Sequence, residues 1–437
     1  MSLHERSPTF PRTAKLARVV EAAWRRPFYQ RHWRAAGIPD LMAARVLIAE
    51  GRLHEFPSLR KSDLRDHLDD LIDFTTAVDV FSSSGTTGRP VDIPILADEE
   101  PVRVEGVRRV LRELGVGPGT RVLQLLSLND LFALGPLAWL AAKAEGACVV
   151  RCSPGRTDRL LQVLEHHRPD VVLGNPYAMI RAAETASAWP PPHLPRRAFL
   201  AVAATFDREL QPMPVTRRVA ELWGVTTWLN HYGSSELGPV GFECLHHRGL
   251  HVHDDVQHVE LVDPRTGAAL DDPRGEGELV VTGLSLPRGF IPVRYATGDI
   301  IAGIDHRPCP CGRTSPRIGP VVGRINQQLK LRGQTLFPEL LLELADRCAG
   351  VARAAVQVRL GALAEDDVTL LVVPAPERAA EEILEDVRAS LQRSLAVSPA
   401  VVQIAPEALA GLEERAARGS NLVKLPRVFD LRDEVAP

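Results

Sequence analysis

The stretch VFSSSGTTGRPVDIP, residues 80–94, places three serines, two threonines and two glycines between an apolar run and a proline. Small, hydroxylated residues after a strand are typical of a loop whose backbone N–H groups surround an anion, because bulky side chains would block its approach. The spacing G-x-x-x-x-G-K-[ST] of the common phosphate loop is absent, since Gly85 and Gly88 are only three residues apart. Taken alone, the stretch fits either a phosphate-binding loop or an ordinary surface loop.

The composition is that of a globular protein with more than one core. A chain of 437 residues favours two domains, or one large and one small. Hydrophobic residues make up 45%, charged residues 24%, and the net charge is −3. The basic residues are dispersed, which argues against a nucleic-acid partner. The chain lacks both an apolar run of roughly 18 residues and the apolar core of a signal peptide, so we expect a cytoplasmic protein without a membrane partner.

Periodicity predicts how the chain is organised. Apolar residues recur at helical spacing from Leu16, and Ser62 is placed to cap a later helix. Between about residues 120 and 285, β-rich runs, the last two at 258–263 and 277–283, alternate with helical stretches, which predicts an α/β domain with a largely parallel sheet. Beyond 323–338 the strand and helix patterns predict a small α+β unit. Its helix carries Ile383, Leu384, Val387, Leu391 and Leu395 on one face.

Several segments in order along the chain resemble the adenylate-forming enzymes, the superfamily of acyl-CoA synthetases, peptide-synthetase adenylation domains and luciferase. They are SSSGTTGRP, NHYGSSELGP, PVRYATGDI, GRINQQLKLRG and VKLPRVFDL. The N-terminal RRPFYQRHWRAAGI and FPSLRKSDLRD further resemble the phenylacetate–coenzyme A ligase branch. This resemblance implies an α/β fold with a large, multi-subdomain adenylating domain at residues 1–324. A small α+β lid domain would follow at residues 325–437, with the active site between the two.

The resemblance also implies roles in adenylation, in which a carboxylate attacks the α-phosphorus of ATP. The phosphate loop would contain Ser82, Ser83, Ser84, Gly85, Thr86, Thr87 and Gly88, with Arg89 where the family usually has lysine. Glu236 would bind Mg²⁺, since a hard cation prefers carboxylate oxygen. Tyr232 would stack on adenine, Gly233 and Ser234 would be further nucleotide-binding residues, and Asp299 would accept hydrogen bonds from the ribose hydroxyls. Arg324 would contact ribose or phosphate, and Lys424 would be the catalytic lysine, followed by Arg427 in a Lys-x-x-Arg ending.

The hinge departs from the family pattern. Where an aspartate is usual the chain has Asn326, and Val423 precedes Lys424 where glycine is common. The family's lid rotates after adenylation so that a thiol, of coenzyme A or of a carrier protein's phosphopantetheine, meets the adenylate. Because the hinge differs, a nitrogen acceptor remains an alternative, and a non-catalytic nucleotide-binding protein is a third interpretation. The chain has only five lysines, Lys15, Lys61, Lys143, Lys330 and Lys424, so each of them is of interest.

Cysteines and histidines predict a metal site. Cys244 precedes His251 by seven residues, and Cys309 and Cys311 follow in CPCGRT. Three thiolates and one imidazole form a closed tetrahedral set, typical of structural zinc. The C-x-C spacing alone leaves zinc open, and the similar pattern in the phenylacetate ligase branch favours it. Arg313 would brace the metal loop. The rival ligands are His246, His247 and His253.

The acid pocket is predicted from the family's corresponding segments. Its candidate liners are Phe132, Leu134, Tyr177, Ala203, Ala204 and Gly238. They are mostly apolar and small, which favours an aryl or modest acyl acid.

Overall fold

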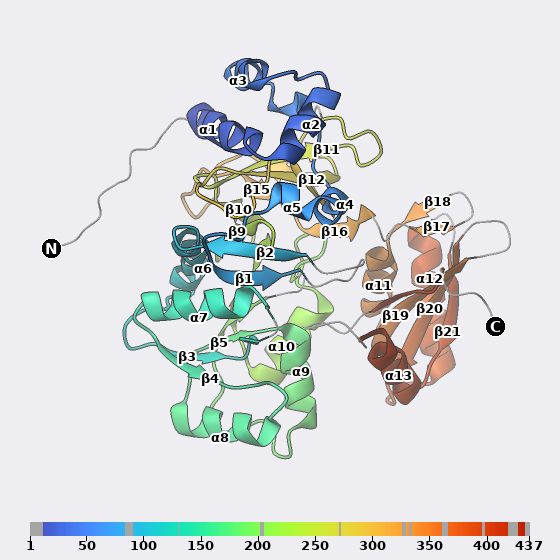
Figure 1. The fold of residues 1–437 in the computed structure, drawn as a ribbon. Helices are drawn as coiled ribbons and strands as arrows, with labels where there is room; N and C mark the ends of the chain where they lie inside the picture. The colour runs from blue at the N-terminus through green and yellow to red at the C-terminus, as the bar shows by residue number, and fades with distance from the viewer. Residues whose placement is uncertain are drawn as a thin grey trace.

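The computed structural model describes most of the chain. The described residues are 12–83, 91–129, 131–201, 205–270, 272–325, 329–331, 334–360, 366–395, 398–417 and 427–432. Figure 1 shows a large body and, beside it, a smaller unit coloured orange to red. The expected α/β class, with a large N-terminal part and a small C-terminal one, is confirmed. The boundary predicted at residues 324–325 falls directly after a strand that ends at Arg324.

A group of helices opens the chain at one end of the large body (Figure 1). Their bounds are α1 Arg12–Trp24, α2 Pro27–Ala35, α3 Leu41–Ala49, the 3-10 turn η1 Leu53–Glu55, α4 Lys61–Asp66 and α5 Leu68–Leu71. The predicted opening helix is α1, which buries its apolar face. The predicted cap at Ser62 is wrong, because α4 already begins at Lys61. The carboxylate of Asp63 accepts a hydrogen bond from the backbone N–H of the cap residue, Arg60, at 2.7 Å.

Main-chain contacts fasten this helical group to the antiparallel strand β13, Tyr295–Ile301. The backbone N–H of Leu59 donates to the carbonyl of Arg294 at 2.9 Å, and that of Ala296 donates to the carbonyl of Leu59 at 2.8 Å. The buried Tyr29 hydroxyl donates to the carbonyl of Ile291 at 2.5 Å. The start of α4 is therefore fixed beside β13.

A parallel sheet forms the middle of the large body. Its strands, β3 Arg121–Gln124, β4 Cys148–Arg151, β5 Val171–Gly174, β6 Arg197–Leu200 and β7 Thr227–Leu229, are ordered β4-β3-β5-β6-β7. The helices of this region are α6 Glu100–Glu113, α7 Leu134–Ala144, α8 Thr157–His167, α9 Pro176–Thr185 and α10 Pro214–Trp223. Strand β5 is buried at every residue, as expected for a parallel sheet covered on both faces.

Antiparallel strands complete the large body. They are β1 Ala77–Ser82, β2 Asp92–Leu96, β8 His231–Ser234, β9 Gly238–Glu243, β10 Leu250–Val252, β11 Gln257–Val262, β12 Gly277–Gly283, β13, β14 Ile304–Asp305, β15 Arg317–Ile318 and β16 Val321–Arg324. The strand orders are β14-β15-β10-β9-β8 and β11-β12-β13-β16, and β1 pairs with β2. Assigning 258–263 and 277–283 to the parallel sheet was wrong. The described residues between β11 and β12 form turns, where a parallel pair would usually need a crossover helix.

The smaller unit has its own sheet and core. Its elements are β17 Leu329–Leu331, β18 Gln334–Leu336, α11 Pro338–Asp346, β19 Val351–Leu360, β20 Asp366–Pro374, α12 Ala380–Ser394, β21 Ala400–Gln403, α13 Pro406–Ala417 and β22 Val428–Asp430. The sheet order is β21-β20-β19-β22, and α12 is the helix predicted around Leu384–Leu391. Its buried cluster, which includes Leu341, Val356 and Leu370, is separate from the core of the large body. Among the described helices, none has the length and apolar character to cross a membrane.

Candidate functional site

The turn between β8 and β9 carries Glu236, the predicted Mg²⁺ ligand. Ser234 lies opposite Gly238 across this tight connection. Gly238 has φ +75°, which residues with a Cβ rarely adopt, and an added Cβ would lie 3.2 Å from Cγ of Arg103. Glu236 is only 3% exposed. The turn thus presents a carboxylate in a buried position at the end of a strand pair.

Lys61, at the start of α4, is the counterion of Glu236. Its Nζ lies 2.9 Å from Oε1 of Glu236. Burial by itself would raise the pKa of Glu236, but the charge and hydrogen bond of Lys61 outweigh burial and keep that pKa below its ordinary value. The carboxylate is therefore ionised at neutral pH. The sequence assigned Lys61 no role, although its signal was available in the scarcity of lysine along the chain.

The carboxylate of Glu236 suits Mg²⁺. It is an anionic oxygen donor, which this cation prefers, and one carboxylate is enough because Mg²⁺ commonly completes its shell with water and substrate phosphates. Lys61 places a positive charge beside this carboxylate. The pair therefore offers one group for a cation and one for an anion.

Tyr232, Asp299 and Arg324 come together from three strands. The Tyr232 hydroxyl donates to Oδ2 of Asp299 at 2.7 Å, and Nε of Arg324 lies 2.8 Å from Oδ1. Asp299 and Arg324 face each other across β13 and β16. Burial, and after it the charge of Asp299, raises the pKa of Tyr232 well above its usual value, so the phenol keeps its proton. These contacts unite three of the predicted nucleotide residues.

Tyr295 connects the two acids of the site. Burial and then the charge of Glu236 raise the pKa of its phenol well above the usual value, and the charge of Asp299 acts in the same direction. Tyr232, whose hydroxyl binds Asp299, lies on β8, the strand that leads into the Glu236 turn, so the two acids lie beside the same strand.

The described ends of the serine- and threonine-rich loop meet this site. The N–H of Ser83 donates to the carbonyl of Val91, and the N–H of Val91 donates to Oγ of Ser83, both at 2.9 Å. The Ser235 hydroxyl donates to the carbonyl of Ser82 at 2.9 Å. The two ends of the predicted phosphate loop are therefore held together beside the Glu236 turn.

Some predicted residues lie outside the described part of the chain. They are Ser84, Gly85, Thr86, Thr87, Gly88, Arg89, Ala203, Ala204, Asn326 and Lys424. Their roles stay predictions.

The remaining acid-pocket candidates are spread over the large body. Phe132 and Leu134 belong to its main core at the start of α7, and Tyr177 lies in the first turn of α9. A surface pocket of about 540 Å³ lies elsewhere, lined by Phe206, Trp228 and His247 among others. The acid pocket stays a prediction.

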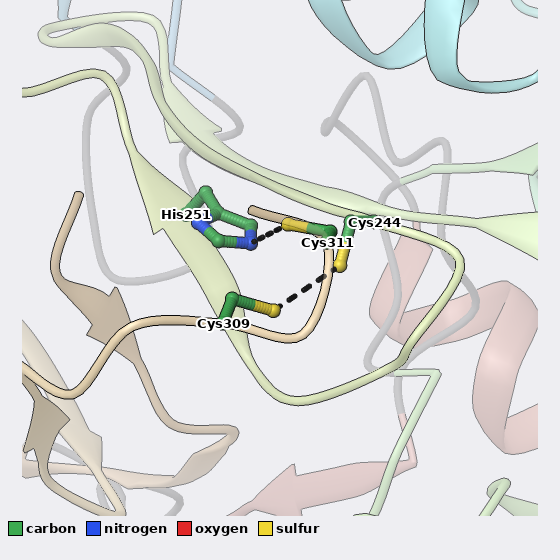
Figure 2. A group of neighbouring side chains, drawn as sticks. All are labelled: Cys244, His251, Cys309 and Cys311. Carbon is green, nitrogen blue, oxygen red and sulfur yellow. Dashed lines mark hydrogen bonds between the residues drawn. The ribbon is translucent and has the colours of Figure 1, made fainter. Parts of the chain in front are cut away.

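The four predicted metal ligands converge (Figure 2). One ligand atom from each of Cys244, His251, Cys309 and Cys311 lies within 4.8 Å of all the others. Sγ of Cys244 is 3.8 Å from Sγ of Cys309, and Sγ of Cys311 is 3.3 Å from Nε2 of His251. A tetrahedron with metal–sulfur bonds of about 2.3 Å has edges of about 3.8 Å. The cluster therefore matches a tetrahedral zinc centre in both chemistry and spacing.

Neighbouring groups orient the cluster. Nδ1 of His251 lies 3.1 Å from the Ser315 hydroxyl, which leaves Nε2 facing Cys311. Arg313 reaches Sγ of Cys311 at 3.5 Å and Glu113 at 2.7 Å, the bracing contact expected of it. The rival ligands His246, His247 and His253 are not part of the converging group.

Two arginines of the smaller unit bond to the large body. Arg427, three residues after Lys424, binds Asp346 with two hydrogen bonds of 2.7 Å and also bonds the side chain of Tyr177. Arg347 lies 2.7 Å from Asp207 and 2.8 Å from Glu209 of the large body. The C-terminal segment that leads back to Lys424 is thus anchored to both units.

The chain is similar to known proteins in sequence and in fold. A model of the family described as AMP-binding enzyme matches residues 70–291. The chain is 34% identical to the phenylacetate-coenzyme A ligase of Thermus thermophilus over 334 residues, which cover 74% of this chain and 72% of that one. A solved structure of 2-hydroxyisobutyryl-CoA ligase in the postadenylation state, in complex with 2-HIB-AMP, matches with a TM-score of 0.78 and 21% identity, over 97% of this chain and 89% of that chain.

The same ligase in its thioesterification state, in complex with 2-HIB-AMP and CoA, matches less closely. Its TM-score is 0.62, with 23% identity over 99% of this chain and 91% of that chain. Both matches show that the chain shares the fold of that ligase.

Proposed function

This chain belongs to the AMP-binding enzymes, in the branch of the phenylacetate–coenzyme A ligases, and we propose that it converts a small aryl or acyl carboxylic acid into an acyl-adenylate and then into a coenzyme A thioester. The observation that carries the proposal is the convergence of Glu236 with Lys61, and of Asp299 with Tyr232 and Arg324, around one site. Such a site provides cations for phosphates and a carboxylate for ribose hydroxyls.

In the first half-reaction, a carboxylate oxygen of the acid attacks the α-phosphorus of ATP. The bond from that phosphorus to the bridging oxygen breaks, and pyrophosphate leaves with its electron pair. Asp299 would accept hydrogen bonds from the ribose, with Arg324 and Tyr232 fixing the orientation of its carboxylate. Lys61 would attract the triphosphate, and Lys424 would offset negative charge on the reacting oxygens.

Glu236 would hold Mg²⁺, and the ion, when bound, neutralises phosphate charge that develops during pyrophosphate release. Because Lys61 keeps the pKa of Glu236 low, its carboxylate is already ionised before the ion binds.

In the second half-reaction, the thiol sulfur attacks the acyl carbonyl, AMP leaves and the thiol proton passes to solvent. Adenylation and thiol transfer need different groups at the adenylate, so we propose that the smaller unit rotates at a hinge near Asn326. The half-exposed Arg347 contacts with Asp207 and Glu209 suit a contact that forms in one state and breaks in the other. We propose coenzyme A as the acceptor of the acyl group. A carrier-protein thiol and an amine are the alternative acceptors that the experiments distinguish.

We propose that Cys244, His251, Cys309 and Cys311 hold structural zinc. All four positions of a tetrahedron are taken by protein, which leaves none for substrate or water. Bound zinc would stabilise the segments that lead into β10 and β15.

The test is acid-dependent exchange of labelled pyrophosphate into ATP. The panel would include phenylacetate, benzoate and short acyl acids, and each acid would be tested with wild type and with Glu236→Gln. We expect exchange with an aryl or short acyl acid, and its loss in Glu236→Gln. Exposed Asp272, which pairs with Arg274, gives a matched control in Asp272→Asn, expected to behave as wild type. Folded protein that supports exchange with none of the acids would contradict the proposal.

A further inference from the structure

A buried charged group lies beneath the Glu236 turn. Its members, Glu99, Arg103 and Arg288, are 2%, 3% and 4% exposed. Glu99 directly precedes α6 and Arg103 lies one turn further along, whereas Arg288 comes from the segment between β12 and β13. We call these three residues the Glu99 group.

The carboxylate of Glu99 holds the group together. Its Oε1 accepts from Nε of Arg103 at 2.9 Å and lies 3.4 Å from Nε of Arg288. Its Oε2 accepts from the backbone N–H of Gly289 at 3.2 Å. One carboxylate thereby orients two guanidinium groups from distant parts of the chain.

Both guanidinium groups point their remaining donors at the Glu236 turn. Nη1 of Arg103 donates to the carbonyl of Ser235, and Nη2 of Arg288 donates to the carbonyl of Leu237, each at 2.8 Å. These carbonyls belong to the residues immediately before and after Glu236. We propose that Arg103 and Arg288 are positioning residues, which fix the peptide group before Glu236 and the one after Leu237, and so aim the Glu236 carboxylate at the cation that accompanies ATP.

Stability alone does not account for the Glu99 group. Two guanidinium groups share one carboxylate, so the buried group has a surplus positive charge. Buried ion pairs rarely add net stability over apolar side chains of similar size. Hydrogen bonds from charged donors are stronger and more directional than neutral ones, which suits a role in fixing a main-chain turn.

The two carbonyl groups differ in how many side chains bind them. The Leu237 carbonyl also accepts from Nε2 of buried Gln257 at 3.0 Å. Loss of Arg103 should therefore disturb the turn more than loss of Arg288.

The inference rests on the proposed function, and two independent readouts test it. The variants are Arg103→Lys and Arg288→Lys, which keep the charge but lose the forked geometry. The matched control is Arg317→Lys, because Arg317 is also 4% exposed but binds Asp305 and the carbonyls of Arg248 and Arg307 instead. One readout is the Mg²⁺ concentration for half-maximal pyrophosphate exchange. The other is hydrogen–deuterium exchange in peptides covering residues 230–240, which needs no activity.

We expect Arg103→Lys to raise the required Mg²⁺ about tenfold, the loss expected for one charged hydrogen bond, and Arg288→Lys to raise it less. Amide exchange in residues 230–240 should be faster in both variants and unchanged in Arg317→Lys. If either lysine variant fails to fold, Glu99→Gln takes its place with the same expectations.

Folded variants with wild-type Mg²⁺ dependence and wild-type amide exchange would overturn the inference. An effect of the same size in Arg317→Lys would also overturn it, because the effect would then follow from changing any buried arginine and not from the contacts with the Glu236 turn. Wild-type protein without pyrophosphate exchange would instead contradict the proposed function, while amide exchange would still decide whether these arginines fix the turn.

Discussion

The nucleotide side of the site and the contacts of the smaller unit are built differently. Glu236 and Asp299 are 3% and 7% exposed, and each pairs with a cation of the same large body, Lys61 or Arg324. Arg347 of the smaller unit has a side chain 42% exposed where it meets Asp207 and Glu209. Solvent-exposed ion pairs contribute little stability, typically about 0–1 kcal/mol. The first pairs lie within one unit and suit a site formed before substrate binds, whereas the Arg347 pairs join the two units and suit a contact that breaks when the units move.

The largest effect is expected at the nucleotide side. Asp299→Asn keeps the shape of the side chain but removes the charge that faces Arg324 and the proposed ribose. We predict a fall of about 100-fold or more in pyrophosphate exchange, on the scale seen when one preorganised electrostatic group is removed. Steady-state exchange at saturating acid measures it. A variant within twofold of wild type would show that Asp299 is not part of the nucleotide site.

Removing a metal ligand should act on stability more than on chemistry. We predict that Cys309→Ser loses bound zinc and lowers the midpoint of thermal unfolding by roughly 5–10 °C, with exchange per folded molecule nearly unchanged. Elemental analysis and thermal unfolding provide the measurements. Cys348→Ser, which removes a thiol outside the cluster, serves as control. Full zinc content in Cys309→Ser would contradict the assignment.

An intermediate effect is expected at the anchor of the C-terminal segment. Arg427→Gln breaks the paired hydrogen bonds to Asp346 and the bond to Tyr177, so the segment that follows Lys424 in the sequence loses its anchor. We predict about a tenfold fall in exchange. Arg432→Gln, in the same segment but paired with Asp430 and Asp366, should stay near wild type. Equal losses in the two variants would indicate general disorder of the segment rather than an anchor for Lys424.

The smallest effect is expected at Arg347. Arg347→Gln removes partly exposed ion pairs, so we predict a two- to threefold fall in pyrophosphate exchange. High salt, which screens the same pairs, should produce a similar fall in wild type. Thioester formation from preformed acyl-adenylate should not fall. Single-turnover assays separate the two half-reactions, and Arg378→Gln, paired with Asp386 within the smaller unit, is the control. A larger loss in thioester formation than in adenylation would show that the Arg347 contact forms during thiol transfer and not during adenylation.

The sequence predicted those features that depend on residues close together in the chain. The parallel strands, the two-part α/β class and the metal cluster followed from local patterns, and Glu236 and Asp299 could be named because each lies in a recognisable motif. Strand pairing was harder, since runs such as 258–263 look alike in parallel and antiparallel sheets. The cap of α4 was misplaced by one polar residue, because Asp63 rather than Ser62 provides the capping contact.

Partners joined only by the fold could not be predicted. Lys61 meets Glu236 because α4 packs beside β13, and Arg103 meets Ser235 from 132 positions away. A lone lysine or arginine in a helix usually indicates a solvent-exposed charge, so its burial and its partner are known only once the tertiary packing is known. Sequence motifs thus identified the groups expected to touch ATP, whereas the structure identified the groups that hold them.

The most direct test of the account follows the fate of the adenylate. With an acid that supports exchange, AMP and acyl product would be quantified together, with coenzyme A, with an amine or with neither. The account predicts one thioester per AMP with coenzyme A, and little AMP release in its absence. AMP release that coenzyme A does not stimulate, or an amide formed in preference to a thioester, would contradict the proposed acid–coenzyme A ligase.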